Sequence, residues 1–422
     1  MRVFVMIGTA LFGAAIVLPE RAPVVSALTG APVPGVALDH SLGYLVLAPF
    51  FGVMDYLTVL TVPQHVTWLV GVFLAFGVWR MARRRTPRGW VARGFIEGGA
   101  LVGFTLALAA FLAAGALAYR PMAALVVEDP DVVVVDFHSH TRGSHDGRWD
   151  FTAERNRSWH RGAGTHVAFI ADHDSVAPIL RAMERNPRRA GDGTVVLPAR
   201  EFVWAGQHVV ALGTVDPRTA TDAWQPDPGA PPAPHAVGEG DPSTRWCDGW
   251  PVLIQTIPND LGRVPVPSCG PDGAGVEAIE LLDGDPRGLL QSDVERERIL
   301  AIADSLDLAL VSASNLHGWG AAAASWNLLR IPGWRDMTPE AVGARIESML
   351  RFGGRDAVEV MAYRRPSMAG DGGMAALGAT VSLPLHFAAQ RSRAERVSWL
   401  VWMALALMAG LAFERRRGTE RA

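Results

Sequence analysis

Residues 131–147 read DVVVVDFHSHTRGSHDG, and this stretch decides the fold of the segment around it. Its first half is a run of β-branched residues, which predicts a buried strand over 131–137. Two histidines follow at positions i and i+2, His138 and His140. Side chains two residues apart on extended backbone point to the same side, so both imidazoles can reach one ion. The stretch therefore predicts a strand that ends in a candidate metal site.

Strand and helix patterns alternate downstream of this stretch. Strands are expected at 166–172, 195–201, 208–213, 252–257, 276–282 and 308–314, and helices at 151–160, 175–185, 293–305 and 339–351. Residues 214–245 contain seven prolines and are expected to form an insertion. The alternation predicts an α/β fold with a parallel sheet or barrel, whose function lies at the carboxyl ends of the strands.

Polar residues gather where these strands are expected to end. The candidate metal ligands are His138, His140, Asp146, His173, Glu201, His208, Asn315 and His317. Imidazole and carboxylate without thiolate suit Zn²⁺, Mn²⁺ or Fe²⁺. Arg142 and Arg200 flank the motifs and could hold a phosphate, although a surface ion pair is the simpler interpretation of each arginine alone. Asp174 could orient a ligand histidine.

The motifs DFHSHTRGSHDG, IADHDSV, PARE with HVVALG, and SASNLHG together resemble those of the PHP (polymerase and histidinol phosphatase) superfamily. The resemblance covers about 130–320. It implies a distorted, TIM-like (β/α)7 barrel with two or three divalent metal ions that catalyse phosphoester hydrolysis. By the resemblance, His138, His140, Glu201 and Asn315 would hold one ion, and Asp146, His173 and His317 a second. Glu201 and His208 would hold a third.

Two positions depart from the family pattern. Asn315 stands where the family usually has Asp, so a charged ligand becomes a neutral one. Ile257 precedes Pro258 where the family often has His, which removes an imidazole from the third site. We therefore expect two metals, or a third that binds weakly.

Long apolar stretches lie outside this segment. Runs suited to membrane helices occupy 3–18, 43–62, 66–81, 98–119 and 397–413, so four or five transmembrane helices are expected. The run 43–62 contains Asp55, which makes an interfacial or re-entrant helix the alternative there.

Arginine placement predicts the orientation. Segment 80–93 carries six Arg and no acid, and the tail 414–422 carries four Arg against two Glu, so both are expected in the cytoplasm. The predicted organisation is a transmembrane region over 1–120, a catalytic domain over 125–395 outside the cytoplasm, and a final membrane helix over 397–413. In that compartment, Cys247 and Cys269 are expected to form a disulfide.

Composition limits the function classes. Hydrophobic residues make up 49% of the 422 residues and charged residues 19%, which excludes a disordered chain. The net charge of −3, with the acidic excess between 120 and 396, makes nucleic acid an improbable partner. The leading hypothesis is a multi-pass cell-membrane protein that hydrolyses a phosphorylated small molecule or a lipid-like phosphate. The alternatives are hydrolysis of an amide or carboxylic ester, and a non-catalytic metal- or ligand-binding sensor.

Overall fold

The computed structural model describes Gly13 and residues 20–82, 90–173, 177–204, 207–213, 251–257, 276–284, 291–320, 322–365 and 373–419. The chain divides into two compact units. The sheet unit comprises Val24–Asp39 and Ala123–Tyr363, and the helical unit comprises Met1–Pro23, His40–Met122 and Arg364–Ala422. The expected insertion at 214–245, the two cysteines and Asp174 all lie outside the described residues.

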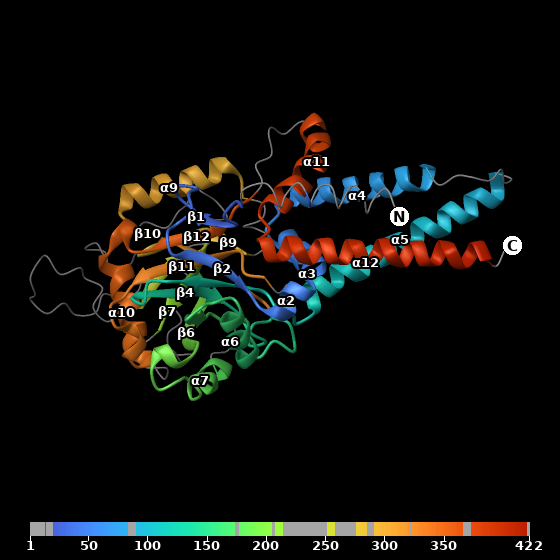
Figure 1. The fold of residues 1–422 in the computed structure, drawn as a ribbon. Coiled ribbons are helices and arrows are strands. Elements are labelled where there is room, and N and C mark those ends of the chain that lie inside the picture. The colour runs from blue at the N-terminus through green and yellow to red at the C-terminus, as the bar shows by residue number, and fades with distance from the viewer. Residues whose placement is uncertain are drawn as a thin grey trace, which may run out of the picture. The chain divides into compact units, whose positions relative to one another are not determined.

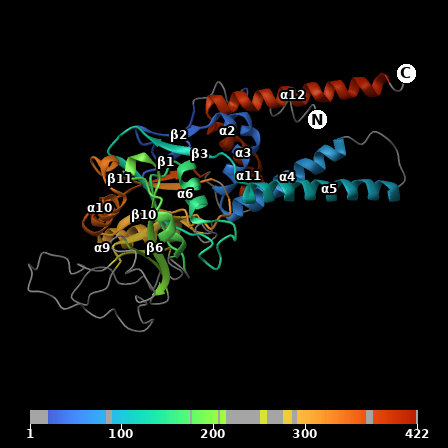
Figure 2. The same cartoon turned by 90° about the horizontal axis from the view of Figure 1, so that it is seen from below.

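One curled sheet forms the core of the sheet unit (Figures 1 and 2). Within the described residues it has ten strands, in the order β1-β12-β11-β4-β5-β6-β7-β8-β9-β10. These strands are β1 (Val24–Ser26), β4 (Val132–Ser139), β5 (Val167–Ile170), β6 (Val195–Trp204), β7 (Gln207–Leu212), β8 (Val252–Gln255), β9 (Ala278–Asp283), β10 (Ala309–Ala313), β11 (Ser325–Arg330) and β12 (Glu359–Tyr363). A separate pair is formed by β2 (Val36–His40) and β3 (Ala123–Val127).

The strand directions differ in part from the predicted parallel barrel. The strand pairs β4-β5, β5-β6, β8-β9 and β9-β10 are parallel. The pairs β6-β7 and β7-β8 are antiparallel, so β7 runs opposite to both of its neighbours. Strands β11 and β12 were not predicted. They pair antiparallel with each other, and β11 also pairs antiparallel with β4. The result is an α/β fold with a curled half-barrel sheet of mixed strand directions, rather than a uniform alternation of parallel strands and helices.

Helices cover the outer side of the curled sheet. They are α6 (Ala153–Gly162), α7 (Ala177–Met183), α9 (Asp293–Leu306) and α10 (Pro339–Phe352), with the short 3₁₀ turns η1 (Ala190–Asp192), η2 (Trp334–Asp336) and η3 (Gly354–Asp356) (Figures 1 and 2). Buried valine, leucine and isoleucine side chains from both layers form one apolar cluster, which includes Val133, Leu197, Ile254 and Ile346. Burial of this apolar surface fixes the positions of the strand ends.

The curl brings the end of β10 back to the end of β4. Leu316 forms a parallel bridge with Ser139, and the Asn315 amide donates to the His138 carbonyl at 2.9 Å. The buried side chain of Asn327 also spans this junction, because it bonds Ser312 and the carbonyl of Val135. Motifs 177 residues apart in the chain therefore meet at one edge of the sheet.

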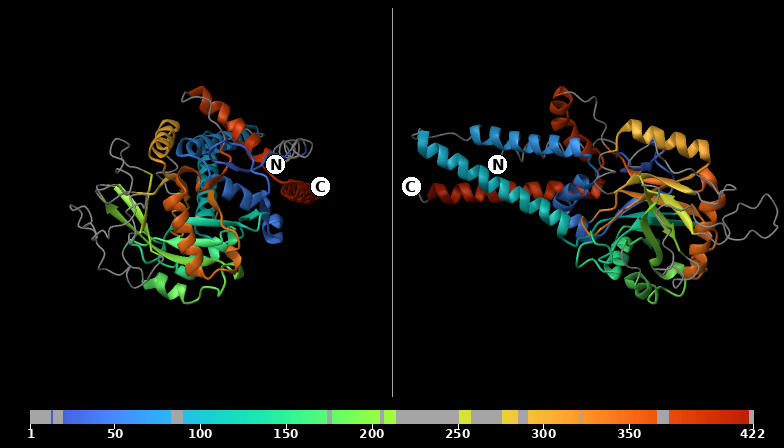
Figure 3. Two further views of the ribbon diagram at one scale, coloured as in Figure 1. Left: turned by 90° about the vertical axis from the view of Figure 1, so that its left-hand side faces the viewer. Right: turned by 180° about the vertical axis from the view of Figure 1, so that it is seen from behind.

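Among the described residues, three helices of the helical unit are long and apolar enough to cross a membrane: α4 (Val62–Ala82), α5 (Trp90–Leu117) and α12 (Arg393–Thr419), the last through Ala412 (Figures 1 and 3). The predicted stretch 3–18 lies outside the described residues apart from Gly13. Stretch 66–81 falls within α4, 98–119 largely within α5, and 397–413 within α12.

The stretch 43–62 does not form a single long helix. It folds into two short helices, α2 (Leu42–Val46) and α3 (Ala48–Thr58), so the expectation of one membrane-spanning helix there was wrong. Asp55 explains the difference, because its buried carboxylate pairs with Arg120 at 2.5 Å and accepts from the Tyr44 hydroxyl at 2.9 Å. A carboxylate with these partners lies inside the unit rather than in lipid.

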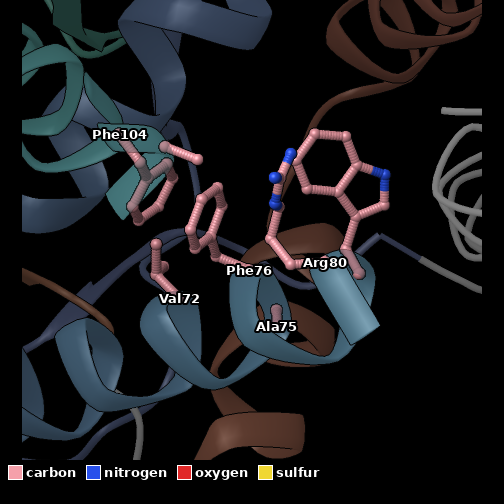
Figure 4. Close-up of a pocket in the computed structure, with 7 residues that line it drawn as sticks. Val72, Ala75, Phe76, Arg80 and Phe104 are labelled. Atoms are coloured by element: carbon pink, nitrogen blue, oxygen red, sulfur yellow. The ribbon is translucent and has the colours of Figure 1, made fainter. Parts of the chain in front are cut away.

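The remaining helix, α11 (Gly373–Ala389), contacts α4. A groove of about 560 Å³ lies between α4 and α5 (Figure 4). Its walls are apolar, with Val72, Phe76 and Phe104 among them, and Arg80 lies at its side. Because Arg80 is paired with Glu97 at 2.8 Å, the groove presents mainly apolar surface.

Candidate metal centre

The candidate ligands form two groups at the carboxyl ends of the strands. In the first, His138 is the last but one residue of β4 and His140 follows the strand, and both meet Glu201 of β6. The Nε2 atoms of His138 and His140 lie 2.9 Å apart, and they lie 3.1 and 3.3 Å from Glu201 Oε2. All three residues are buried. One ligand atom from each lies within 4.8 Å of the others, which is a geometry that can hold a metal ion.

The second group surrounds Asp146. His317 Nε2 lies 3.1 Å from Asp146 Oδ2, and His173 Nε2 lies 3.7 Å from it. His173 Nε2 also lies 3.1 Å from Glu201 Oε2, so it joins the two groups. Ring nitrogens of His140, His173 and His317 again lie within 4.8 Å of one another. The two groups contain the residues of the two ligand sets that the resemblance implies, except Asn315, whose side chain pairs with Asp283; their binding of metal ions stays a prediction.

The imidazoles are held so that their Nε2 atoms face the cluster. His138 Nδ1 donates to the buried Glu280 carboxylate at 2.8 Å, and His317 Nδ1 donates to the carbonyl of Asn315 at 2.8 Å. Neither acceptor carries a hydrogen, so in a neutral ring the lone pair lies on Nε2. This is the tautomer in which Nε2 binds a metal.

A carboxylate fixes the loop that carries His140. Asp172 accepts from the amide and the hydroxyl of Thr141, each at 2.6 Å, and from Ser144 Oγ at 3.3 Å. Ser144 Oγ lies 2.9 Å from His140 Nδ1 and accepts from the His173 amide at 3.0 Å. Burial raises the pKa of Asp172. The same motif that supplies His173 therefore also supplies the group that orients the first loop.

Opposite charges dominate the electrostatics of the first group. Burial favours neutral His138, but the charges of Glu201 and Glu280 outweigh it and raise the pKa of His138. Burial lowers the pKa of His140 to about 3. Burial also disfavours the Glu201 carboxylate, yet the charge of His138 and hydrogen bonds from His138, His140 and His208 hold the pKa of Glu201 well below its usual range. The metal-free cluster thus combines an ionised Glu201 with a neutral His140 and a charged His138, so a metal that binds His138 must displace its proton.

The side chain of Asn315 tests the fit to a metal. Its Nδ2 donates to Asp283 Oδ2 at 3.1 Å, and its buried Oδ1 has no hydrogen-bond partner among the described residues. A buried amide oxygen without a hydrogen-bond donor destabilises the fold. A cation beside it would pair with this oxygen, and imidazole, carboxylate and amide oxygen together suit a divalent first-row ion. The residues present therefore fit a metal centre.

Three residues that the sequence predicted for the site lie outside the two ligand groups. His208 Nδ1 donates to Glu201 Oε1 at 2.7 Å, on the oxygen that does not face the other imidazoles. Arg200 precedes Glu201 in β6, and alternation along a strand points its side chain to the opposite face. Arg142 is exposed on the loop after β4. Their roles stay predictions, and the geometry favours Arg142 over Arg200 as a phosphate contact.

Sequence reasoning missed Glu280 and Asp283. Both lie on β9, and Glu280 is fully buried in a strand whose other residues are mostly apolar. A buried carboxylate requires a partner, so Glu280 within the apolar run AIELLD was a usable signal. Its partner could not be identified, because 142 residues separate it from His138.

No protein-family model matches this chain, and no curated protein is similar to it at a significant level. Comparison with solved structures finds PsfC from Pseudomonas syringae PB-5123, with 16% identity and a TM-score of 0.34 over 61% of this chain and 98% of that one.

Two further structures are similar at the same low level. One is described as a metal-dependent phosphoesterase from Bifidobacterium adolescentis, with 18% identity and a TM-score of 0.30 over 51% of this chain and 96% of that one. The other is an amidohydrolase from Chromobacterium violaceum, with 17% identity and a TM-score of 0.27 over 49% of this chain and 98% of that one. These scores are too low to show a family or an activity, so the functional argument rests on the cluster itself.

Proposed function

We propose that this protein is a membrane-anchored, metal-dependent phosphoesterase of the PHP type, with its catalytic domain outside the cytoplasm. The observation that carries the proposal is the convergence of four imidazoles on the carboxylates of Glu201 and Asp146. His138, His140 and Glu201 would hold one divalent ion, and Asp146, His173 and His317 a second. Zn²⁺, Mn²⁺ or Fe²⁺ suits these donors.

The ions would contribute Lewis acidity, which lowers the pKa of water and stabilises negative charge on a phosphoryl group. The chain's own residues would hold the reacting groups in place. Glu280 fixes His138, and Asp172 fixes the loop that carries His140, so that little reorganisation is needed when the substrate binds. Arg142, on the exposed part of the same loop, is the residue proposed to pair with the phosphate oxygens.

The membrane part of the proposal rests on α4, α5 and α12, which are each long and apolar enough to cross a bilayer. The arginine-rich segment 80–93 follows α4, and another arginine cluster lies within 414–422. The positive-inside rule puts both in the cytoplasm and the sheet unit on the other side. A thiol-labelling experiment with a membrane-impermeant reagent, on single cysteines introduced at exposed Trp149 and in the segment 83–89, would test this orientation.

Turnover of aryl phosphate mono- and diesters by the purified full chain tests the chemistry. With Mn²⁺ or Zn²⁺ we expect hydrolysis that chelator abolishes and that the His138→Ala plus His140→Ala variant lacks. His166→Ala is the matched control, because His166 precedes β5 at its amino end, whereas His173 follows its carboxyl end. Metal-independent turnover, or equal turnover in the double variant, would contradict the proposal.

Asn315 favours a second candidate, a metal-binding sensor without catalysis, since a neutral amide replaces the usual carboxylate. Bound metal at a fixed stoichiometry without hydrolysis of phosphate, amide or carboxylic ester substrates would support this candidate. Hydrolysis of amides or carboxylic esters alone would instead identify a different hydrolase with the same centre.

A further inference from the structure

Two loops that carry candidate ligands are locked together beside the cluster. The Arg148 amide donates to the His317 carbonyl at 2.9 Å, and Arg148 Nη1 donates to the Gly318 carbonyl at 3.1 Å. Gly318 has a φ of +87°, and a Cβ there would lie 2.6 Å from the Phe151 ring, so only glycine allows this contact. The loop after β4 and the loop after β10 therefore form one continuous rim.

Each loop presents a tryptophan to solvent. Trp149 is 82% exposed and Trp319 is 54% exposed. Tryptophan is largely buried on average, so two exposed indoles on one rim indicate a binding surface. The Arg148 guanidinium lies 6.0 Å from the Trp319 ring and is held by Asp150 at 2.6 Å. One indole thus has a fixed cation beside it and remains more than half exposed.

Chain connectivity places both tryptophans close to the candidate metal centre. Trp149 is three residues beyond Asp146, and Trp319 is two residues beyond His317. At no more than about 3.6 Å per residue, their Cα atoms lie within roughly 11 and 7 Å of those ligands. The second group is also the more open one, because the side chains of its candidate ligands Asp146, His317 and His173 are 43%, 17% and 16% exposed, whereas His138 and His140 are buried.

We propose that Trp149 and Trp319 bind the leaving group of the substrate, and that this group carries a planar ring, as in an aryl or nucleoside phosphate. The inference rests on the proposed phosphoesterase function. If Asp146 and His317 held an ion that binds the phosphate, the ester group would lie within reach of this rim, because both tryptophans are within three residues of these side chains. Exposed indole faces stack on flat rings, and they do so with little regard to the ring's identity.

Calorimetric titration of three phosphonates into the Mn²⁺-loaded full chain separates the possibilities. Methylphosphonate reports phosphate binding alone, benzylphosphonate adds a ring, and hexylphosphonate adds an apolar chain without a ring. We expect benzylphosphonate to bind about 10-fold tighter than methylphosphonate. Trp149→Ala and Trp319→Ala should each remove much of that gain and leave methylphosphonate binding unchanged, whereas Trp319→Phe should retain it. Phe352→Ala removes another exposed ring, 58% exposed on α10, and serves as the control.

Other outcomes overturn the inference in distinguishable ways. Equal binding of benzyl- and methylphosphonate, or no effect of either alanine variant, would refute the leaving-group role while phosphate binding still supports the proposed function. Tighter binding of hexylphosphonate than of benzylphosphonate would assign the rim to an acyl chain and refute the ring. Failure of all three compounds to bind the metal-loaded chain would refute the proposed function, and the inference with it.

Discussion

Replacing Glu280 by glutamine is expected to weaken metal binding although Glu280 does not face the candidate metal centre directly. Glu280 and His138 are both fully buried, and the 2.8 Å bond between them holds the ring with Nε2 toward His140 and Glu201. Glutamine can still accept this hydrogen bond but lacks the negative charge that makes His138 a stronger ligand. Alanine removes the acceptor as well.

The magnitude follows from what such orienting carboxylates contribute elsewhere. Loss of a group that orients a ligand histidine typically reduces metal affinity 10- to 100-fold. We expect about 10-fold for Glu280→Gln and about 100-fold for Glu280→Ala, which correspond to roughly 1.4 and 2.7 kcal/mol of binding free energy.

Titration of Mn²⁺ into chelator-treated full chain measures this effect directly. Glu277→Gln is a matched control, because Glu277 is buried three residues earlier and accepts from the Leu253 amide at 2.8 Å, away from the histidines. It should bind Mn²⁺ like the wild type. If a folded Glu280→Ala variant kept its affinity within twofold, the orienting role of Glu280 would be refuted.

Three further predictions concern Asn315, Glu277 and Gly164. Asn315→Asp puts a second carboxylate 3.1 Å from Asp283, so the metal-free chain should melt at a lower temperature while Mn²⁺ raises its melting temperature more than it does in the wild type. Burial raises the pKa of Glu277 to about 7, with Glu347 adding to the rise and the Leu253 amide and Arg351 opposing it. Glu277 alone should therefore reduce the free energy of unfolding by about 2–3 kcal/mol between pH 4.5 and pH 7, since the unfolded carboxyl ionises first; in denaturant titrations this should appear as the difference between the wild type and Glu277→Gln. Gly164→Ala should lower the free energy of unfolding by about 2 kcal/mol or more, because Gly164 has a φ of +81° and a Cβ there would lie 2.2 Å from the Leu125 carbonyl oxygen. Chemical denaturation measures this loss, and an unchanged midpoint would contradict it.

The strands that carry the candidate ligands were largely predictable from the sequence. The runs at 131–137, 195–201 and 308–314 correspond to β4, β6 and β10, because β-branched and apolar runs bounded by polar residues fit a buried strand. Strand direction was not predictable in the same way. Strand β7 runs antiparallel to β6, and a periodic pattern carries no information about such a reversal of direction.

Contacts between distant strands limited the prediction of the site. The HxH spacing indicates that His138 and His140 share a side, whereas the pairing of Asn315 with Asp283 depends on strands β9 and β10 lying side by side. The same holds for Asp55, which the sequence shows in an apolar run but whose partner Arg120 lies 65 residues away. In each case the residue type signals a buried polar group, and only the fold identifies the partner.

Metal content of the purified full chain tests the central claim most directly. Elemental analysis after expression in metal-supplemented medium should find at least one equivalent of Zn, Mn or Fe per chain in the wild type. The content should fall sharply in His140→Ala plus Glu201→Ala, since this variant removes a ligand from each group and the carboxylate between them. A wild-type chain without bound metal, or a variant with undiminished content, would contradict the account.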